Sequence, residues 1–326
     1  MKRAFVTGAT GFVGSALVRE LLNDGVRVRV LVRATSSLRN LEGLDVETVC
    51  GDVLDEEALR QGLSECDVVY HVAGFYSTRE EDAPLMYDVN VRGTKKVLNL
   101  ALETGASKIV YTSTIGTIGR PEDDSLPTED TEFNLWDTAS HYARSKFLAE
   151  TEALVLGEKG YPIVVVNPCA PIGPRDIKPT STGQRIVDYL RGKMPSFALG
   201  GINFVAVEDV ARGHILAAQQ GAIGHRYILG NVNGNLALAD FLRLMEEISD
   251  VAPPRAAKAS VGARARARVR RLLPRAKKPA PAQAGHRPVA LTCDPSMAVE
   301  ELGLPQTSLK IAFAQAVQWF RENGYA

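Results

Sequence analysis

Residues 7–14 read TGATGFVG and follow an apolar strand pattern at 4–6. The three glycines suit three tasks: Gly8 can form a tight turn, Gly11 lets a pyrophosphate come close to the backbone, and Gly14 lets the next helix pack on the strand. The N-terminus of that helix would add free amide groups and the positive end of a helix dipole. Because the loop stands between a strand and a helix, it predicts a dinucleotide site on a Rossmann-like domain, which a glycine pattern alone would not.

Strand-like and helix-like segments alternate through the first half of the chain. Apolar runs predict strands at 4–6, 26–32, 46–50, 68–72, 109–112 and 163–166. Apolar residues at helical spacing, with Asp55 as an N-cap, predict helices at 14–22, 55–63, 85–104 and 140–158. This alternation predicts the α/β class, with a doubly wound parallel sheet covered by helices on both faces.

The regular alternation of strands and helices ends after Pro168, where further prolines predict a loop. The pattern beyond it predicts short strands at 203–207 and 227–229, and helices at 208–219, 236–249 and 307–323. We therefore expect two parts. A Rossmann-like domain comprises residues 1–168 plus about 204–232, and a smaller, mostly helical substrate-binding part comprises 169–203 plus 233–326.

The composition is that of a globular protein: 45% of the 326 residues are hydrophobic, 23% are charged, and the formal net charge is zero. A neutral chain has no overall attraction to nucleic acid, so no nucleic-acid partner is expected. The cysteines are not at metal-ligand or CxxC spacing, which predicts neither a metal site nor a disulfide framework and fits a reducing, cytoplasmic location. No apolar stretch approaches the roughly 18 residues of a membrane-spanning helix.

Residues 251–293 differ from the rest, because they contain eleven Lys and Arg residues and no Asp or Glu. We expect a helix at 261–273, docked by Val261, Ala265, Val269 and Leu272, followed by a mobile loop at 274–288. A solvated surface helix and loop is the favoured interpretation. A lid over the site, attraction of an anionic substrate, and contact with an anionic membrane surface are the alternatives.

The end of the second predicted strand bears on the choice of cofactor. NAD-specific sites place Asp or Glu there, to bind the ribose 2′-hydroxyl. This chain has Arg33, with Ser36, Ser37 and Arg39 close behind. A guanidinium can bind a 2′-phosphate or stack on adenine. NADP is therefore favoured as the cofactor, with NAD as the alternative.

A tyrosine and a lysine carry the predicted chemistry. Tyr142 and Lys146 are four residues apart and share one face of a predicted helix. A free phenol, with a pKa of ~10, is poorly matched to acid-base work at neutral pH, but a nearby ammonium favours the phenolate. Tyr142 could then exchange a proton with a substrate oxygen while hydride moves at carbon. Thr114 is the predicted third hydroxyl, with Ser113 as the alternative.

These motifs together resemble the extended short-chain dehydrogenase/reductase family, of the NAD-dependent epimerase/dehydratase type. The resemblance runs from residue 3 to about 230 and rests on TGATGFVG, GDV at 51–53, HVAG at 71–74, DVNVRGT at 88–94, the hydroxyl cluster at 111–114, YARSK at 142–146 and Asn167-Pro168. Within the family, residues 167–183 and 227–230 are similar to the hopanoid-associated sugar epimerases and the dihydroflavonol 4-reductase-like proteins.

The resemblance implies a catalytic set and a cofactor site. Thr114, Tyr142 and Lys146 would be catalytic, and Lys146 would also hold the nicotinamide ribose. Together with the glycine loop and Arg33, the predicted cofactor-binding residues are Gly8, Thr10, Gly11, Phe12, Val13, Gly14, Arg33, Asp52, Val53, Ala73, Gly74, Asn90, Thr112, Lys146 and Pro168. The resemblance also implies a homodimer formed through the helices at 85–104 and 140–158.

Two departures from the family narrow the function. Ile115-Gly116 follows Thr114 in place of the Asp-Glu pair of sugar 4,6-dehydratases, so dehydration is not expected. Residues 201–205 lack an arginine that nucleotide-sugar enzymes often carry, which disfavours such a substrate. We expect an NADP-dependent oxidoreductase acting on a carbonyl or alcohol of a small molecule. A sugar epimerase that retains its cofactor, and a non-catalytic dinucleotide-binding regulator, are the alternatives.

Overall fold

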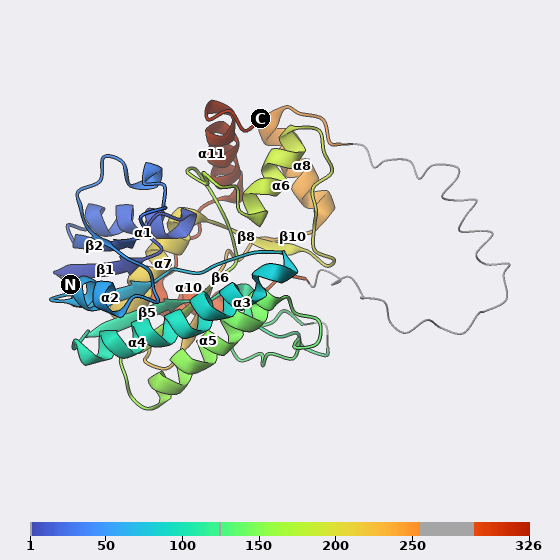
Figure 1. Ribbon diagram of the computed structural model, residues 1–326. Helices are drawn as coiled ribbons and strands as arrows, with labels where there is room; N and C mark the ends of the chain where they lie inside the picture. The colour runs from blue at the N-terminus through green and yellow to red at the C-terminus, as the bar shows by residue number, and fades with distance from the viewer. Residues whose placement is uncertain (1, 124, 255–289) are drawn as a thin grey trace.

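The computed structural model describes residues 2–123, 125–254 and 290–326. Seven strands form the main sheet, in the order β3-β2-β1-β4-β5-β6-β9, and every neighbouring pair is parallel (Figure 1). The strands are β1 (Arg3–Thr7), β2 (Arg27–Val32), β3 (Val46–Cys50), β4 (Val68–His71), β5 (Lys108–Thr112), β6 (Ile163–Pro168) and β9 (Arg226–Leu229). The order reverses direction between β1 and β4, which opens a crevice at the carboxyl ends of the strands.

Helices cover both faces of this sheet (Figure 1). On one face lie α1 (Phe12–Asn23), α7 (Val207–Gln220) and α10 (Ser296–Leu302), which share a core with Ala4 and Val6. On the other lie α2 (Glu56–Leu63), α4 (Thr94–Glu103) and α5 (His141–Glu158), which share a core with Phe5. Because successive side chains of a strand point to opposite faces, a strand covered on both sides reads as a continuous apolar run. The predicted α/β class is confirmed.

The helix predicted at 85–104 forms, but it is not regular. It consists of α3 (Ala83–Tyr87), a π-helical turn η3 (Asp88–Gly93) and α4. Asn90 lies in the wide turn and is buried, and its backbone oxygen accepts a hydrogen bond of 2.6 Å from the Thr94 hydroxyl. A π turn inserts an extra residue into a helix and often marks a functional site.

A second, smaller sheet has the order β10-β8-β7, with strands β7 (Ala170–Ile172), β8 (Ile202–Ala206) and β10 (Asn235–Leu236). Three helices, α6 (Ser181–Leu190), α8 (Leu238–Ser249) and α11 (Leu309–Glu322), pack with it around buried phenylalanines that include Phe204, Phe241 and Phe313. The sequence patterns did not predict β7, β10, α6 or α10 (Ser296–Leu302). In α6 the reason is its weak helix-forming start, Ser181-Thr182-Gly183, which is offset by Thr180, whose hydroxyl accepts from the Gly183 amide.

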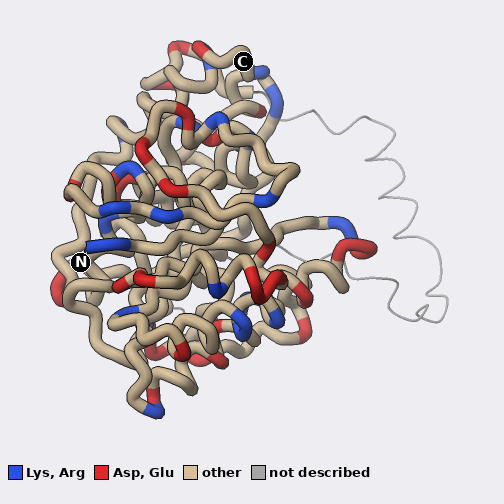
Figure 2. The backbone as a smooth tube through the Cα atoms, turned by 60° about the vertical axis from the view of Figure 1, so that its left-hand side comes forward, with Lys and Arg blue, Asp and Glu red and all other residues tan. Residues whose placement is uncertain are grey.

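The predicted boundary between the two parts, at about residue 204, falls inside β8, a strand of the small sheet. The following α7 packs on the main sheet, and β9 is one of its strands. The predicted helix at 261–273 and loop at 274–288 lie outside the described residues. Within the described ranges, positive and negative side chains are intermixed along the chain (Figure 2). In the same ranges, no helix combines the length and apolarity needed to cross a membrane.

Candidate active site

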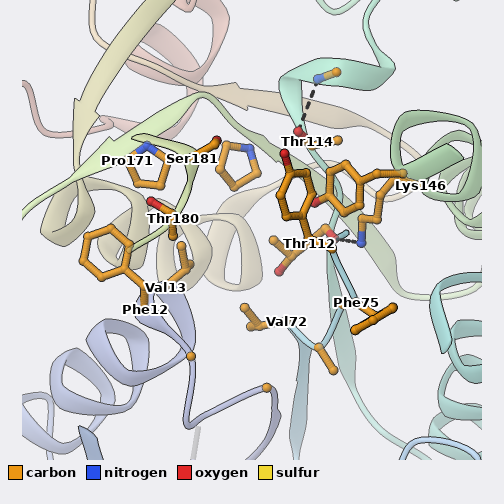
Figure 3. A pocket seen from close by; sticks show the side chains of 18 of the residues that line it. Phe12, Val13, Val72, Phe75, Thr112, Thr114, Lys146, Pro171, Thr180 and Ser181 are labelled. Carbon is orange, nitrogen blue, oxygen red and sulfur yellow. Dashed lines mark hydrogen bonds between the residues drawn. The ribbon is translucent and has the colours of Figure 1, made fainter. Parts of the chain in front are cut away.

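One cavity of about 970 Å³ lies at the carboxyl ends of the main-sheet strands, between them and the N-terminus of α6. Figure 3 shows Phe12 and Val13 on one side of it and Thr114 and Lys146 on the other. Its lining contains every predicted site residue except Asn90: Gly8, Thr10, Gly11, Phe12, Val13, Gly14, Arg33, Asp52, Val53, Ala73, Gly74, Thr112, Thr114, Tyr142, Lys146 and Pro168. Residues that are up to 160 positions apart in sequence thus share a single surface.

The glycine loop has the geometry that a bound pyrophosphate needs. Gly8 has a φ of +73°, and a Cβ there would lie 2.6 Å from the Ala73 nitrogen. A Cβ on Gly14 would lie 2.2 Å from the Gly8 oxygen, so only glycine lets α1 approach the loop. Gly11 is the N-cap of α1 and has no side chain to cap its amides. The first amides of α1 therefore suit an anion, which is consistent with a dinucleotide in the cavity.

Arg33 follows β2, lines the cavity and is exposed. Ser36 and Ser37 line the cavity beside it. No Asp or Glu in the described ranges forms an ion pair with Arg33. The Asp52 carboxylate accepts a hydrogen bond of 3.1 Å from the Leu54 amide and so shapes the turn after β3. The arginine is therefore free to bind an anionic group.

Tyr142 and Lys146 stand one turn apart on α5, which begins where the Ser140 hydroxyl accepts from the Ala143 amide. The Lys146 Nζ donates to the Thr112 oxygen at 2.6 Å and lies 4.4 Å from the centroid of the Tyr111 ring. Burial lowers the pKa of Lys146 to about 7. Burial raises the pKa of Tyr142 to about 12, so the phenol holds its proton and can donate it.

The Thr114 side chain can bind the same substrate oxygen as Tyr142. Its Oγ1 accepts a hydrogen bond of 3.2 Å from the Gly116 amide and caps the 3-10 turn η4 (Ile115–Thr117). Accepting that bond leaves the hydroxyl proton available to a substrate. By contrast, Ser113, the alternative, donates its hydroxyl to the buried Glu150 carboxylate. The geometry favours Thr114.

Asn90 lies outside the cavity lining and supports it. Its Oδ1 accepts from the Phe75 amide at 2.7 Å, and its Nδ2 donates to the Phe75 oxygen at 3.0 Å and the Ser145 hydroxyl at 2.9 Å. These bonds hold the segment after β4 against α5. A Cβ on Gly74 would lie 3.9 Å from the Lys146 Nζ, so this segment packs beside the lysine. The predicted contact of Asn90 with the cofactor stays a prediction.

Glu150, one turn beyond Lys146, was not predicted as a site residue, yet it is bonded to several elements that form the cavity. It is 1% exposed, and its Oε2 accepts from the hydroxyls of Ser113 and Thr117 and from the Asn167 amide at 2.8 Å. Its Oε1 pairs with Arg226 at 2.8 Å. These bonds tie Ser113, which follows β5, and residues of η4, β6 and β9 to α5. The spacing of 142, 146 and 150 places all three side chains on one helix face and was a readable signal.

Further side chains line the cavity near Thr114 and Tyr142. Tyr76, after β4, meets the Tyr142 ring edge-on with 5.0 Å between centroids. Arg120 and Arg185 also line the cavity. The Cys169 sulfur, also in the lining, lies 3.3 Å from that of Cys293, and both cysteines are buried and free. No sequence signal connects Tyr76, Arg120 and Arg185.

The sequence profile of the NAD-dependent epimerase/dehydratase family matches residues 4–230. A protein of Synechocystis sp., named provisionally as a dihydroflavonol 4-reductase, is 41% identical over 98% of this chain and 95% of its own length. Sterol demethylase protein B of Methylococcus capsulatus is 34% identical over 98% of this chain and 98% of its own. The crystal structure of gox2253 has a TM-score of 0.85 at 36% identity, over 100% of this chain and 99% of that chain.

Proposed function

This chain belongs to the NAD-dependent epimerase/dehydratase family, as its motifs indicated, and we propose that it is an NADP-dependent reductase of a carbonyl group on a small molecule. Its family and relatives make it an oxidoreductase or epimerase enzyme. One observation carries the finer proposal: a single cavity is lined both by the glycine loop with Arg33 and by Thr114 with Tyr142. The cofactor end and the proton-donating end therefore share one space.

The residues present fit a bound dinucleotide, which supplies the hydride. The loop around Gly8 and the amides of α1 would hold its pyrophosphate, and Lys146 would hold its nicotinamide ribose. Thr114 and Tyr142 would hydrogen-bond the substrate oxygen, which places the carbonyl carbon for attack. As the carbonyl accepts the hydride, the oxygen gains the Tyr142 proton, and the product is an alcohol. The Lys146 ammonium stabilises the phenolate left behind.

The choice of NADP rests on Arg33. A 2′-phosphate would form a charge-assisted hydrogen bond with its guanidinium, and the hydroxyls of Ser36 and Ser37 lie in the same lining. An NAD site would instead need a carboxylate for the 2′-hydroxyl. NAD is the alternative cofactor.

Net reduction is favoured over epimerisation by the sequence of β8, which borders the cavity, and by the name of one relative. Ile202, the first residue of β8, lines it, and β8 is buried throughout and carries no charged side chain to hold a diphosphate. The relative at 41% identity also carries a reductase name. An epimerase with retained cofactor is the second candidate, because the family includes epimerases.

The test combines cofactor turnover with one substitution. NADPH consumption would be followed with a panel of aromatic and aliphatic aldehydes and ketones, and the alcohol formed would be quantified. A reductase uses one NADPH per alcohol, whereas an epimerase leaves the free NADPH pool unchanged. Tyr142→Phe should reduce turnover by roughly 100-fold or more and leave NADP binding intact.

The control for that substitution is Tyr87→Phe, on α3. The Tyr87 hydroxyl lies 3.3 Å from His141 Nδ1, outside the cavity lining, so its removal should leave turnover unchanged. Near-normal turnover in Tyr142→Phe would refute the assignment of the proton donor. Cofactor binding with no turnover on any substrate, unaffected by Tyr142→Phe, would indicate the non-catalytic regulator instead.

A further inference from the structure

Two guanidinium groups line the substrate end of the cavity, and neither forms an ion pair with a carboxylate among the described residues. They belong to Arg120, six residues beyond Thr114, and to Arg185, on α6. Apolar side chains also line this end, beside Ser and Thr hydroxyls: Phe75, Ile118, Leu135, Ala198, Ile202 and Leu291. A positive charge in apolar surroundings is costly unless something compensates it.

Arg185 is held in a fixed position by the backbone. Its Nε donates to the Ser196 oxygen at 2.8 Å and its Nη1 to the Ser181 oxygen at 2.5 Å. Burial lowers its pKa, and the nearby Tyr76 phenol opposes that shift. Tyr76 in turn contacts the Tyr142 ring. Arg185 is therefore linked through Tyr76 to the neighbourhood of Tyr142, and its Nη2 is not engaged by these bonds.

Arg120 is held in a similar way. Its Nη1 donates to the oxygens of Gly119 at 3.2 Å and Thr292 at 3.3 Å, and its backbone amide donates to Asn134 Oδ1 at 3.0 Å. Its buried Nε has no hydrogen-bond partner in the described part of the chain. Arg120 adds a second positive charge to the same compartment.

The described residues offer little to compensate these charges. Asp176 is the carboxylate that lines this part of the cavity, but its oxygens accept from the Thr180 amide and hydroxyl, and burial raises its pKa to about 6. Asp176 therefore stabilises the start of α6 through Thr180 and does not pair with either arginine.

We propose that the substrate is an apolar carbonyl compound that carries a carboxylate, and that Arg185 binds this carboxylate while Thr114 and Tyr142 bind the carbonyl oxygen. The inference rests on the proposed function and specifies its substrate class. The apolar lining contacts the body of the substrate, and Arg185, already held by two backbone oxygens, loses little freedom on binding. Arg120 strengthens the positive potential without being the primary contact.

The test uses matched pairs of aldehydes that differ only in charge: 4-carboxybenzaldehyde with its methyl ester, and 4-carboxycinnamaldehyde with its methyl ester. With NADPH saturating, wild-type kcat/KM should favour the acid in at least one pair by roughly 10- to 100-fold, the effect of one charge-assisted hydrogen bond. Arg185→Gln should remove that preference by lowering kcat/KM for the acid alone. Equal rates for acid and ester in both pairs would overturn the proposal.

Two variants guard against indirect effects. Arg191→Gln is the matched control, because Arg191 ends the same helix and donates to the Tyr325 oxygen at 2.8 Å, outside the cavity lining. It should keep the acid preference. Arg120→Gln should weaken the preference by less than Arg185→Gln does. If Arg120→Gln alone abolished the preference, or if Arg185→Gln weakened NADP affinity while the preference persisted, the assignment to Arg185 would be wrong.

Calorimetric binding of the same probes to the enzyme–NADP complex separates this proposal from the proposed function. Tighter binding of the acids, lost in Arg185→Gln, supports the carboxylate site even if no aldehyde is reduced, and that absence of turnover would then count against the reductase. Equal affinity for acid and ester would overturn the carboxylate site even if both aldehydes were reduced.

Discussion

Replacing Glu150 with glutamine would test what holds the active-site strands to α5. Glu150 and Arg226 form an ion pair at 2.8 Å, with side-chain exposures of 1% and 15%. Glutamine keeps one acceptor oxygen for Ser113, Thr117 and Asn167. Its amide nitrogen, however, takes the place of the oxygen that faces Arg226, so two donors oppose each other and the guanidinium loses its carboxylate.

The structure indicates the size of the loss. Removing one member of a buried ion pair costs about 3–5 kcal/mol, because the other charge remains buried. Arg226 keeps its bonds to the backbone oxygens of Glu129 at 2.8 Å and Thr131 at 3.0 Å. The loss in the free energy of unfolding should therefore lie near the lower end, about 3 kcal/mol.

Urea unfolding followed by circular dichroism measures this loss. Glu152→Gln is the matched control on the same helix, because Glu152 pairs with Lys95 at 2.9 Å on the surface, with exposures of 34% and 49%. It should cost at most about 1 kcal/mol. The double variant Glu150→Gln with Arg226→Gln should lose less than the sum of its single variants, because it leaves no unpaired charge. A loss in Glu150→Gln no greater than in the surface control would refute the reasoning.

Three further results are expected. Arg33→Ala should weaken NADP binding by roughly 10- to 100-fold, measured by fluorescence titration, and leave NAD binding nearly unchanged; equal losses would mean that Arg33 does not bind a 2′-phosphate. Because burial lowers the pKa of Lys146 to about 7, its ammonium is lost as pH rises through that value, so kcat/KM for reduction should fall there. Lys146→Met should remove this dependence and weaken cofactor binding, and a pH profile like that of wild type would argue against the role of Lys146. A homodimer is expected through the predicted helices at 85–104 and 140–158, where Val155 is 39% exposed on α5. Val155→Glu should give a monomer by light scattering, and a wild-type monomer at micromolar concentration would contradict the interface.

Much of the main sheet could be predicted because its signals are local. The strands are covered on both faces, so they read as apolar runs, and Asp55 caps α2 through the Ala58 amide as its position indicates. The task predicted for Gly14 follows from its close approach to Gly8, a neighbour in the chain, and the tight turn at Gly8 is a local feature, whereas the packing of Ala73 against Gly8 is not. Irregular elements were harder to predict from the sequence. Asn90, in the π turn, bonds to Phe75 and Ser145, which lie 15 and 55 residues away.

The sequence by itself determined the fold class, the glycine loop and the Tyr142–Lys146 pair, because each depends on spacing within one strand, loop or helix. Only the tertiary structure decided what surrounds them. Glu150 receives its partners from the residue after β5 and from η4, β6 and β9, and Arg226 lies 76 residues away from it. Arg185 reaches the substrate end because α6 packs over the cavity. Such contacts depend on how separate elements pack, and no periodicity along the chain records which side chains will meet across that distance.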